Sequence, residues 1–215
     1  NDIQQSHLND WMIYFPCSYT DNAEELKRLK VENPNQRIFV ISNTNELSSK
    51  SHLWKNLVKK YGRIGAQKMS PLSYVLYDPD DVDLLKKEYV KKNIYIMKKN
   101  IQRQEGLQIT SDLNELVNGY TNQYVVAQIL LQDPYLINTR KINMRFYVLM
   151  VCQKGETSAY AHNNGFMYYT KDPFKYGSTE IGSNITTGYI DRQVYETNPL
   201  THQDFRKYLD RQDRY

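Results

Sequence analysis

Basic side chains beside predicted strands are the residues of this sequence best suited to chemistry. Lys98 ends a predicted strand, and Arg103 lies in the loop after it. Alternation along a later strand places Lys141, Asn143 and Arg145 on one face. Several cations on one face near a basic loop suit a polyphosphate, because each cation can bind phosphate oxygens. Phosphate chemistry is therefore the first hypothesis.

A structural role is the alternative for the same residues. Lys and Arg at strand edges are usually solvated and hinder edge-to-edge pairing, and the pattern alone favours this alternative for Lys98 and Arg103. Arg145 differs because it precedes the apolar run Phe146–Leu149, where we expect partial burial and an anionic partner. Gln128, inside an apolar strand, needs hydrogen-bond partners from either a ligand or the protein.

The motifs of four common enzyme classes are absent from the sequence. It contains no GxGxxG, GxxxxGKS/T, HExxH or GxSxG run, and its four histidines show no zinc-binding spacing. Dinucleotide binding, P-loop chemistry, zinc proteolysis and serine hydrolysis are therefore not expected.

The composition predicts a globular protein of one or two domains. Of the 215 residues, 40% are hydrophobic and 24% are charged, which argues against wholesale disorder. The 28 Lys and Arg residues are nearly balanced by 24 Asp and Glu residues, and no RNP or KH motif is present. A nucleic-acid partner is therefore not expected.

Cysteine usage and hydropathy predict a cytoplasmic protein. Cys17 and Cys152 are the only cysteines, which is too few for a disulfide framework. No apolar run approaches the roughly 18 residues that a membrane helix requires. No secretory leader opens the chain, so we expect neither secretion nor a membrane partner.

Three regions are expected to position the basic side chains. Residues 1–48 predict a small α/β region, in which Asp21 or Asn22 caps a helix between a strand within Trp11–Tyr19 and a buried strand at Arg37–Ser42. Residues 132–215 predict a sheet-rich region with strands Asn143–Gln153 and Ser158–His162.

Residues 49–131 predict a mixture of helices and strands. A helical pattern begins at Ser49 and stops at Gly62, and further helices are expected after Asp80 or Asp81 and after Ser111 or Asp112. The predicted strands are Tyr74–Tyr77, Ile94–Lys98, Leu107–Thr110 and Tyr124–Leu131. The loop Lys99–Glu105 would close a hairpin between the second and third of these strands.

Two local signals are expected to shape the end of the chain. Asn163-Asn164-Gly165 predicts a turn between strands. Thr201 with Asp204 resembles a capping box before a last helix that contains Phe205 and Tyr208.

A resemblance to a known family rests on three consecutive runs of residues. They are Tyr124-Val-Val-Ala-Gln128-Ile-Leu-Leu131, Pro134-Tyr-Leu-Ile137 and Arg140-Lys141-Ile-Asn143-Met-Arg145-Phe-Tyr147-Val-Leu149. In order and spacing they resemble the tubulin–tyrosine ligase-like family, whose pattern there is V-V-Q-x-Y-I, P-L-L-I and R-K-F-D-x-R-x-Y-V-L. Tyr95-Ile-Met-Lys98 followed by Glu105-Gly106-Leu107 is similar to the family's W-I-x-K-P…G-x-G-I hairpin.

The resemblance implies an α+β protein with the ATP-grasp fold. ATP would lie between a central lobe, residues 49–131 with the phosphate hairpin, and a C-terminal lobe, residues 132–215. Family members use ATP and Mg²⁺ to phosphorylate a carboxylate, which an amine then attacks to give an amide. The partners implied are ATP, an amino acid and a protein acceptor such as a tubulin tail.

The resemblance also implies roles for individual residues. Lys50 would reach the γ-phosphate and act with Arg145 in catalysis. The other ATP-binding residues implied are Lys98 and Arg103 on the phosphates, Gln128 and the backbone of Ile129 to Leu131 at adenine, and Lys141 with Arg145 at ribose and phosphate.

Several positions depart from the family pattern. Lys99 replaces a Pro, Asn143 an Asp, Tyr168 an Arg and Asn184 a His. The family's metal-binding segment would follow Tyr215, so the metal ligands stay unassigned and we expect no ligation by this chain alone. The alternative function is a non-catalytic module that binds a nucleotide or a protein tail.

Overall fold

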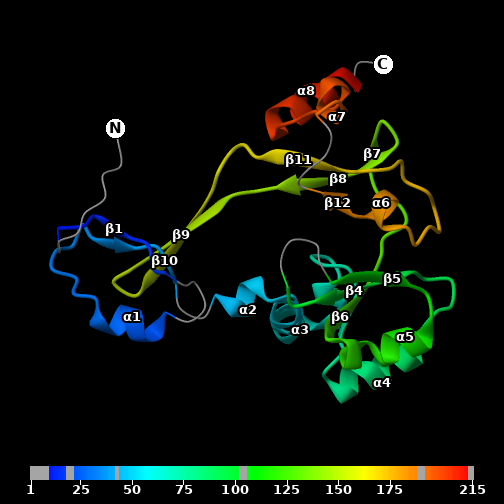
Figure 1. The fold of residues 1–215 in the computed structure, drawn as a ribbon, viewed down its shortest axis with the longest axis horizontal. Coiled ribbons are helices and arrows are strands. Elements are labelled where there is room, and N and C mark those ends of the chain that lie inside the picture. The colour runs from blue at the N-terminus through cyan, green and yellow to red at the C-terminus, as the bar shows by residue number, and fades with distance from the viewer. Residues whose placement is uncertain (1–9, 18–21, 42–43, 102–105, 188–191, 213–215) are drawn as a thin grey trace. The chain divides into compact units, whose positions relative to one another are not determined.

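The computed structural model describes residues 10–17, 22–41, 44–101, 106–187 and 192–212. The chain forms two compact units, Asn1–Asn45 and Glu46–Tyr215, whose elements are labelled in Figure 1. Within the described ranges, every helix is too short or too polar to cross a lipid bilayer. Cys17 and Cys152 are exposed and free, as expected.

The first unit is a small α/β arrangement. Strand β1 (Ile13–Tyr14) pairs in parallel with β2 (Arg37–Ile38), and helix α1 (Ala23–Arg28) connects them. The Tyr14 hydroxyl donates to the Glu25 carboxylate at 2.6 Å, which fastens the helix to the first strand. The prediction of a buried strand at Arg37–Ser42 was wrong, because β2 is shorter and its two residues are exposed and half-buried.

The second unit contains a four-stranded antiparallel sheet in the order β3-β6-β4-β5, which we call the first sheet. Its strands are β3 (Ser73–Val75), β4 (Tyr95–Lys99), β5 (Leu107–Thr110) and β6 (Tyr124–Ile129). The helices of this region are α2 (Asn45–Ser48), α3 (Lys50–Ala66), α4 (Pro79–Glu88), α5 (Leu113–Val117) and the 3-10 turn η1 (Gly119–Asn122).

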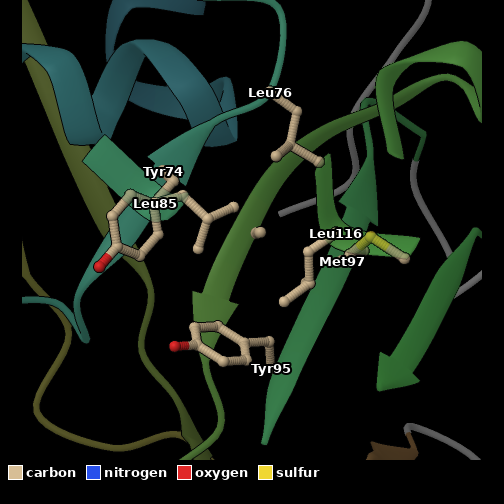
Figure 2. Close-up of a cluster of buried hydrophobic side chains, with 7 residues drawn as sticks. Tyr74, Leu76, Leu85, Tyr95, Met97 and Leu116 are labelled. Atoms are coloured by element: carbon tan, nitrogen blue, oxygen red, sulfur yellow. The ribbon is translucent and has the colours of Figure 1, made fainter. Parts of the chain in front are cut away.

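Because side chains alternate in direction along a strand, the two faces of the first sheet have different roles. Tyr95 and Met97 of β4 point to the face that α4 and α5 cover, where they pack with Leu85 and Leu116 (Figure 2). Ile96 and Lys98 point to the opposite face. One strand therefore builds the core and presents a cation to the other side.

Local signals fix where these helices begin. The Asp112 carboxylate accepts a hydrogen bond from the Glu115 amide at 3.0 Å, as expected for the cap of α5. The prediction that Asp80 or Asp81 caps α4 was wrong, because Asp78 is the N-cap and Pro79 takes the first helical position. Asp81 instead accepts from the Val75 amide at 2.8 Å.

Helix α3 is interrupted near the position where we expected it to stop. Gly62 has φ +69°, which L-residues rarely adopt, and one further turn continues to Ala66. Arg63 in this turn pairs with Asp81 of α4 at 3.2 Å, so the interruption directs the end of α3 toward the next helix.

The second sheet of this unit is antiparallel with the order β12-β11-β8-β7. Its strands are β7 (Leu136–Ile137), β8 (Arg140–Arg145), β11 (Phe166–Thr170) and β12 (Thr186–Thr187), and helix α6 (Ile181–Asn184) precedes β12. Helices α7 (Val194–Thr197) and α8 (His202–Gln212) pack on the face that carries Met167 and Tyr169. The mixed helices and antiparallel strands confirm the α+β class.

The capping box predicted before the last helix is present. The Asp204 carboxylate accepts from the Thr201 amide at 3.0 Å, and the Asp204 amide donates to the Thr201 hydroxyl at 3.2 Å.

The predicted strand Asn143–Gln153 is broken at Phe146–Tyr147, so that prediction was wrong. Strand β8 ends at Arg145 and pairs with β11, whereas β9 (Val148–Gln153) pairs with β10 (Glu156–Ala161) in a separate ribbon. Lys154 and Gly155, with φ of 54° and 81°, form the turn between β9 and β10. The Asn163–Gly165 segment joins β10 to β11, which do not pair with each other.

Replacing Leu85 by Ala should reduce the free energy of unfolding by about 2–5 kcal/mol, because the fully buried side chain would leave a cavity against Tyr74 and Tyr95. Urea denaturation measures this loss. Ile64→Ala is the matched control, since Ile64 is 80% exposed and its loss should leave the midpoint unchanged. Equal effects in the two variants would contradict this description of the core.

Candidate functional site

A pocket of about 600 Å³ lies within the second unit and takes its walls from both sheets. This volume is in the range of small-molecule sites. All the site residues predicted from the sequence line it, except Arg103, which lies outside the described residues. Those that the pocket brings together are Lys50, Lys98, Gln128, Ile129, Leu131, Lys141 and Arg145.

The described lining of the pocket is positively charged. It contains Lys50, Lys98, Lys141 and Arg145 but no Asp or Glu. None of the ion pairs found among the described residues involves these four side chains. Cations that converge without a counter-charge attract an anion of several charges, so the pocket suits a polyphosphate.

Lys98 is held by a neutral side chain. Its ammonium donates to the Gln128 side-chain oxygen at 2.6 Å, and the Gln128 amide nitrogen donates to the Ser73 hydroxyl at 2.8 Å. Gln128 lies directly opposite Ser73 on one side and Ile96 on the other. The hydrogen-bond partners of Gln128 were expected to come from either a ligand or the protein. In the structure the protein supplies them, and the Gln128 amide positions Lys98.

Burial makes the charge of Lys98 sensitive to pH. Removal from water, with a smaller contribution from the Lys50 charge nearby, lowers the pKa of Lys98 to about 8. The hydrogen bond to Gln128 does not offset this effect in full, because its amide carries no charge. The ammonium therefore gains from an anion in the pocket.

Lys50 and Lys141 each donate a hydrogen bond to a backbone carbonyl. Lys50 donates to the Ile101 carbonyl at 3.1 Å, and Lys141 donates to the Leu131 carbonyl at 3.4 Å. Burial lowers the pKa of both lysines. The contact of Lys141 joins β8 to the segment that connects the two sheets.

Arg145 differs from the expectation of partial burial and an anionic partner. Its side chain is exposed, and its guanidinium carbon lies 4.9 Å from the centre of the Tyr168 ring. The break in the strand after Arg145 explains its exposure, because the apolar run Phe146–Leu149 leaves the second sheet instead of continuing it.

One wall of the pocket is apolar. Ile96 and Leu130 belong to a buried cluster against which Ile185 packs, and all three line the pocket. Leu130 also donates its amide to the Ile94 carbonyl at 2.8 Å, which anchors the connection between the sheets. This wall suits a flat apolar group such as a nucleobase.

The described residues fit a nucleotide better than a metal ion. No group of three or more His, Cys, Asp or Glu side chains gathers anywhere in the described ranges. The lining that the structure describes offers amide and hydroxyl groups, including Asn143, but none of the carboxylates that Mg²⁺ prefers. Any magnesium would depend largely on the oxygens of the ligand.

Sequence reasoning missed the partners that hold the predicted residues. Ser73 supports Gln128, Phe174 lies 5.3 Å from the Lys141 ammonium, and Tyr168 lies against Arg145. Ser73 faces Gln128 across neighbouring strands, and Tyr168 faces Asn143. The contacts of Ser73 and Tyr168 depend on strand register between distant segments, for which one sequence offers no local signal.

The pKa of Lys98 predicts how binding of a polyphosphate such as ATP depends on pH. The terminal phosphate has a pKa of about 6. It is therefore ionised at pH values below the pKa of about 8 at which Lys98 loses its proton. Affinity should therefore be highest below pH 8 and then fall by up to about tenfold per pH unit. Calorimetric titrations between pH 7 and 9.5 measure this dependence.

Lys98→Met should bind ATP more weakly at pH 7, and its affinity should lack the change centred near pH 8. Lys207→Met, at an exposed position on α8, is the matched control. It should keep the affinity of the parent at pH 7 and the same pH dependence. A Lys98→Met variant with an unchanged pH profile would show that another group titrates.

Comparison with known proteins places the chain in a family. A model of the tubulin-tyrosine ligase family matches residues 28–186. A probable beta-tubulin polyglutamylase from Tetrahymena thermophila is 32% identical over an alignment of 142 residues, and the match covers 63% of this chain but only 12% of that protein. Since the family match covers most of the sequence, the chain belongs to the tubulin-tyrosine ligase family.

Proposed function

We propose that this chain binds ATP as part of a ligase of the tubulin–tyrosine ligase type, which joins an amino acid to a protein. The observation that carries the proposal is the pocket between two antiparallel sheets, whose described lining has four cations and no acidic residue. An ATP-grasp arrangement, with the nucleotide held between two α+β lobes, accounts for this geometry.

Different residues of the pocket would contact different parts of the nucleotide. The apolar wall of Ile96, Leu130 and Ile185 would hold the base, and backbone groups from Ile129 to Leu131 would contact its edge. Lys98 and Arg145 would bind phosphate oxygens from opposite sheets. Positive charge and positioning are what phosphoryl transfer chiefly requires from a protein.

ATP when bound would supply the phosphoryl group that activates a carboxylate for attack by an amine. The chain's own contribution is to hold the triphosphate with fixed cations, which include Lys50 at the start of α3 and Lys141 on β8. No nucleophilic side chain is required, which agrees with the absence of Asp, Glu and Cys from the described part of the lining. Mg²⁺ would accompany ATP through its phosphate oxygens.

The acceptor that we propose is tubulin, and the amino acid is glutamate. The relative from Tetrahymena thermophila is named as a probable beta-tubulin polyglutamylase, and its matched segment extends over 142 residues. A tail rich in glutamate would supply both the carboxylate to be activated and an acidic chain for basic side chains to bind.

A second candidate is a nucleotide-binding module without catalytic activity. Asn143 and Tyr168 favour it, because they place neutral side chains where the family pattern has charged ones. The two candidates share the nucleotide site and differ only in whether bond formation follows.

ATP should stabilise the folded chain. At ten times its dissociation constant, a ligand that binds only the folded state adds about 1.4 kcal/mol to the free energy of unfolding, which raises the melting temperature by roughly 3–6 °C for a chain of this size. Arg145→Gln should lose most of this shift. Thermal denaturation at increasing ATP concentrations, with and without Mg²⁺, provides the measurement.

Arg206→Gln, an exposed arginine of α8 outside the pocket lining, is the matched control and should keep the full shift. Absence of any ATP-dependent stabilisation of the parent at millimolar nucleotide would refute the proposed nucleotide site.

The native protein should transfer glutamate to tubulin. Incubation with ATP, Mg²⁺, tubulin and radiolabelled glutamate should give labelled tubulin, and Lys98→Met should reduce the initial rate at least tenfold because phosphate binding would be lost. Tubulin from which the acidic tails have been removed is the control acceptor. Binding of ATP without incorporation of any amino acid would favour the module.

A further inference from the structure

Two cations of the pocket lie over aromatic rings. The Arg145 guanidinium carbon is 4.9 Å from the centre of the Tyr168 ring, and the Lys141 ammonium is 5.3 Å from the centre of the Phe174 ring. Both distances are within the range of cation–π attraction. Neither cation has a carboxylate partner among the described residues.

The strand register fixes the position of Tyr168. Tyr168 is directly opposite Asn143, and Arg145 is opposite Phe166, so Tyr168 and Arg145 are diagonal neighbours on one face. On the other face of β11, Met167 and Tyr169 are fully buried against α7 and α8. The backbone that carries Tyr168 is therefore anchored by the core.

An aromatic ring and a carboxylate would affect Arg145 differently. A carboxylate would orient the guanidinium but would also neutralise it and compete with an incoming phosphate. The face of a ring restricts the long side chain without supplying a negative charge. The positive charge then stays available to a ligand in the pocket, and less side-chain freedom is lost on binding.

We infer that Tyr168 is a positioning residue that holds the Arg145 guanidinium at the pocket, oriented and not neutralised, for a polyphosphate ligand. The inference rests on the proposed function, because it takes the ligand of the pocket to be ATP. Asn143, opposite Tyr168, keeps this part of the site free of negative charge. Phe174 has the same relation to Lys141.

A double-mutant cycle between Tyr168 and Arg145 tests the inference. Dissociation constants are measured by calorimetry for two probes, ATP and inorganic tripolyphosphate. Tyr168→Leu should weaken both probes about three- to fivefold, which is the usual strength of an exposed cation–π contact. Tyr168→Phe, which keeps the face of the ring, should bind like the parent.

The Arg145→Gln background shows whether Tyr168 acts through the guanidinium. In this background Tyr168→Leu should cause no further loss, since the cation that the ring holds is already absent. Tyr168→Glu should bind at least as weakly as Tyr168→Leu, because it would orient Arg145 and neutralise it. Tyr160→Leu, on β10 at a side chain 58% exposed, is the matched control and should match the parent.

Several outcomes would overturn the inference. Equal losses from Tyr168→Leu with and without Arg145 would mean that the ring touches the ligand directly. Tight binding by Tyr168→Leu or by Tyr168→Glu would mean that Arg145 needs no such partner.

Failure of the proposed function can be distinguished from failure of the inference. If the parent binds tripolyphosphate but not ATP, the nucleotide assignment fails, while the cycle with tripolyphosphate still decides the role of Tyr168. If the parent binds neither probe, the proposed function and the inference are both overturned.

Discussion

Positive charge without a counter-charge is the constraint that the second unit of this protein must satisfy. Lys98 is partly buried, and its hydrogen-bond partner among the described residues is the neutral amide of Gln128, at 2.6 Å. Burial lowers the pKa of Lys98 to about 8, so the fold holds an ammonium in a place that disfavours its charge. Such an arrangement destabilises the folded state and is relieved when an anion binds.

Because side chains alternate between the two faces of a strand, core packing on one face can compensate for the destabilising charge on the other. On β4, Tyr95 and Met97 pack into the core with α4 and α5 (Figure 2), while Lys98 faces the pocket. On β11, Met167 and Tyr169 are buried under α7 and α8, while Tyr168 faces the pocket. Each sheet therefore packs a core against one face, while its other face lines the pocket with both apolar and polar side chains.

Much of this arrangement could be predicted from the sequence. Alternation identified β4, a continuous apolar run identified β6, and β5 was predicted as the second strand of the hairpin. Local cap signals identified the starts of α5 and α8, and family motifs gathered pocket residues from both sheets. Most of the failures have a common cause. The break after Arg145 and the partners of Gln128 and Arg145 depend on contacts between distant segments, which local pattern does not encode. The Asp78 cap is different, because Pro79 at the first helical position is a local signal for it.

Asn143 and Tyr168 show why residues that depart from a family pattern are better judged together than one at a time. They depart from the family pattern at separate points of the sequence, yet they face each other directly across β8 and β11. A carboxylate at 143 would share a face with Lys141 and Arg145 and would neutralise them, whereas a cation at 168 would repel Arg145. With both positions neutral, the cations of β8 keep their charge and no further cation is added beside Arg145, so the two departures are mutually consistent.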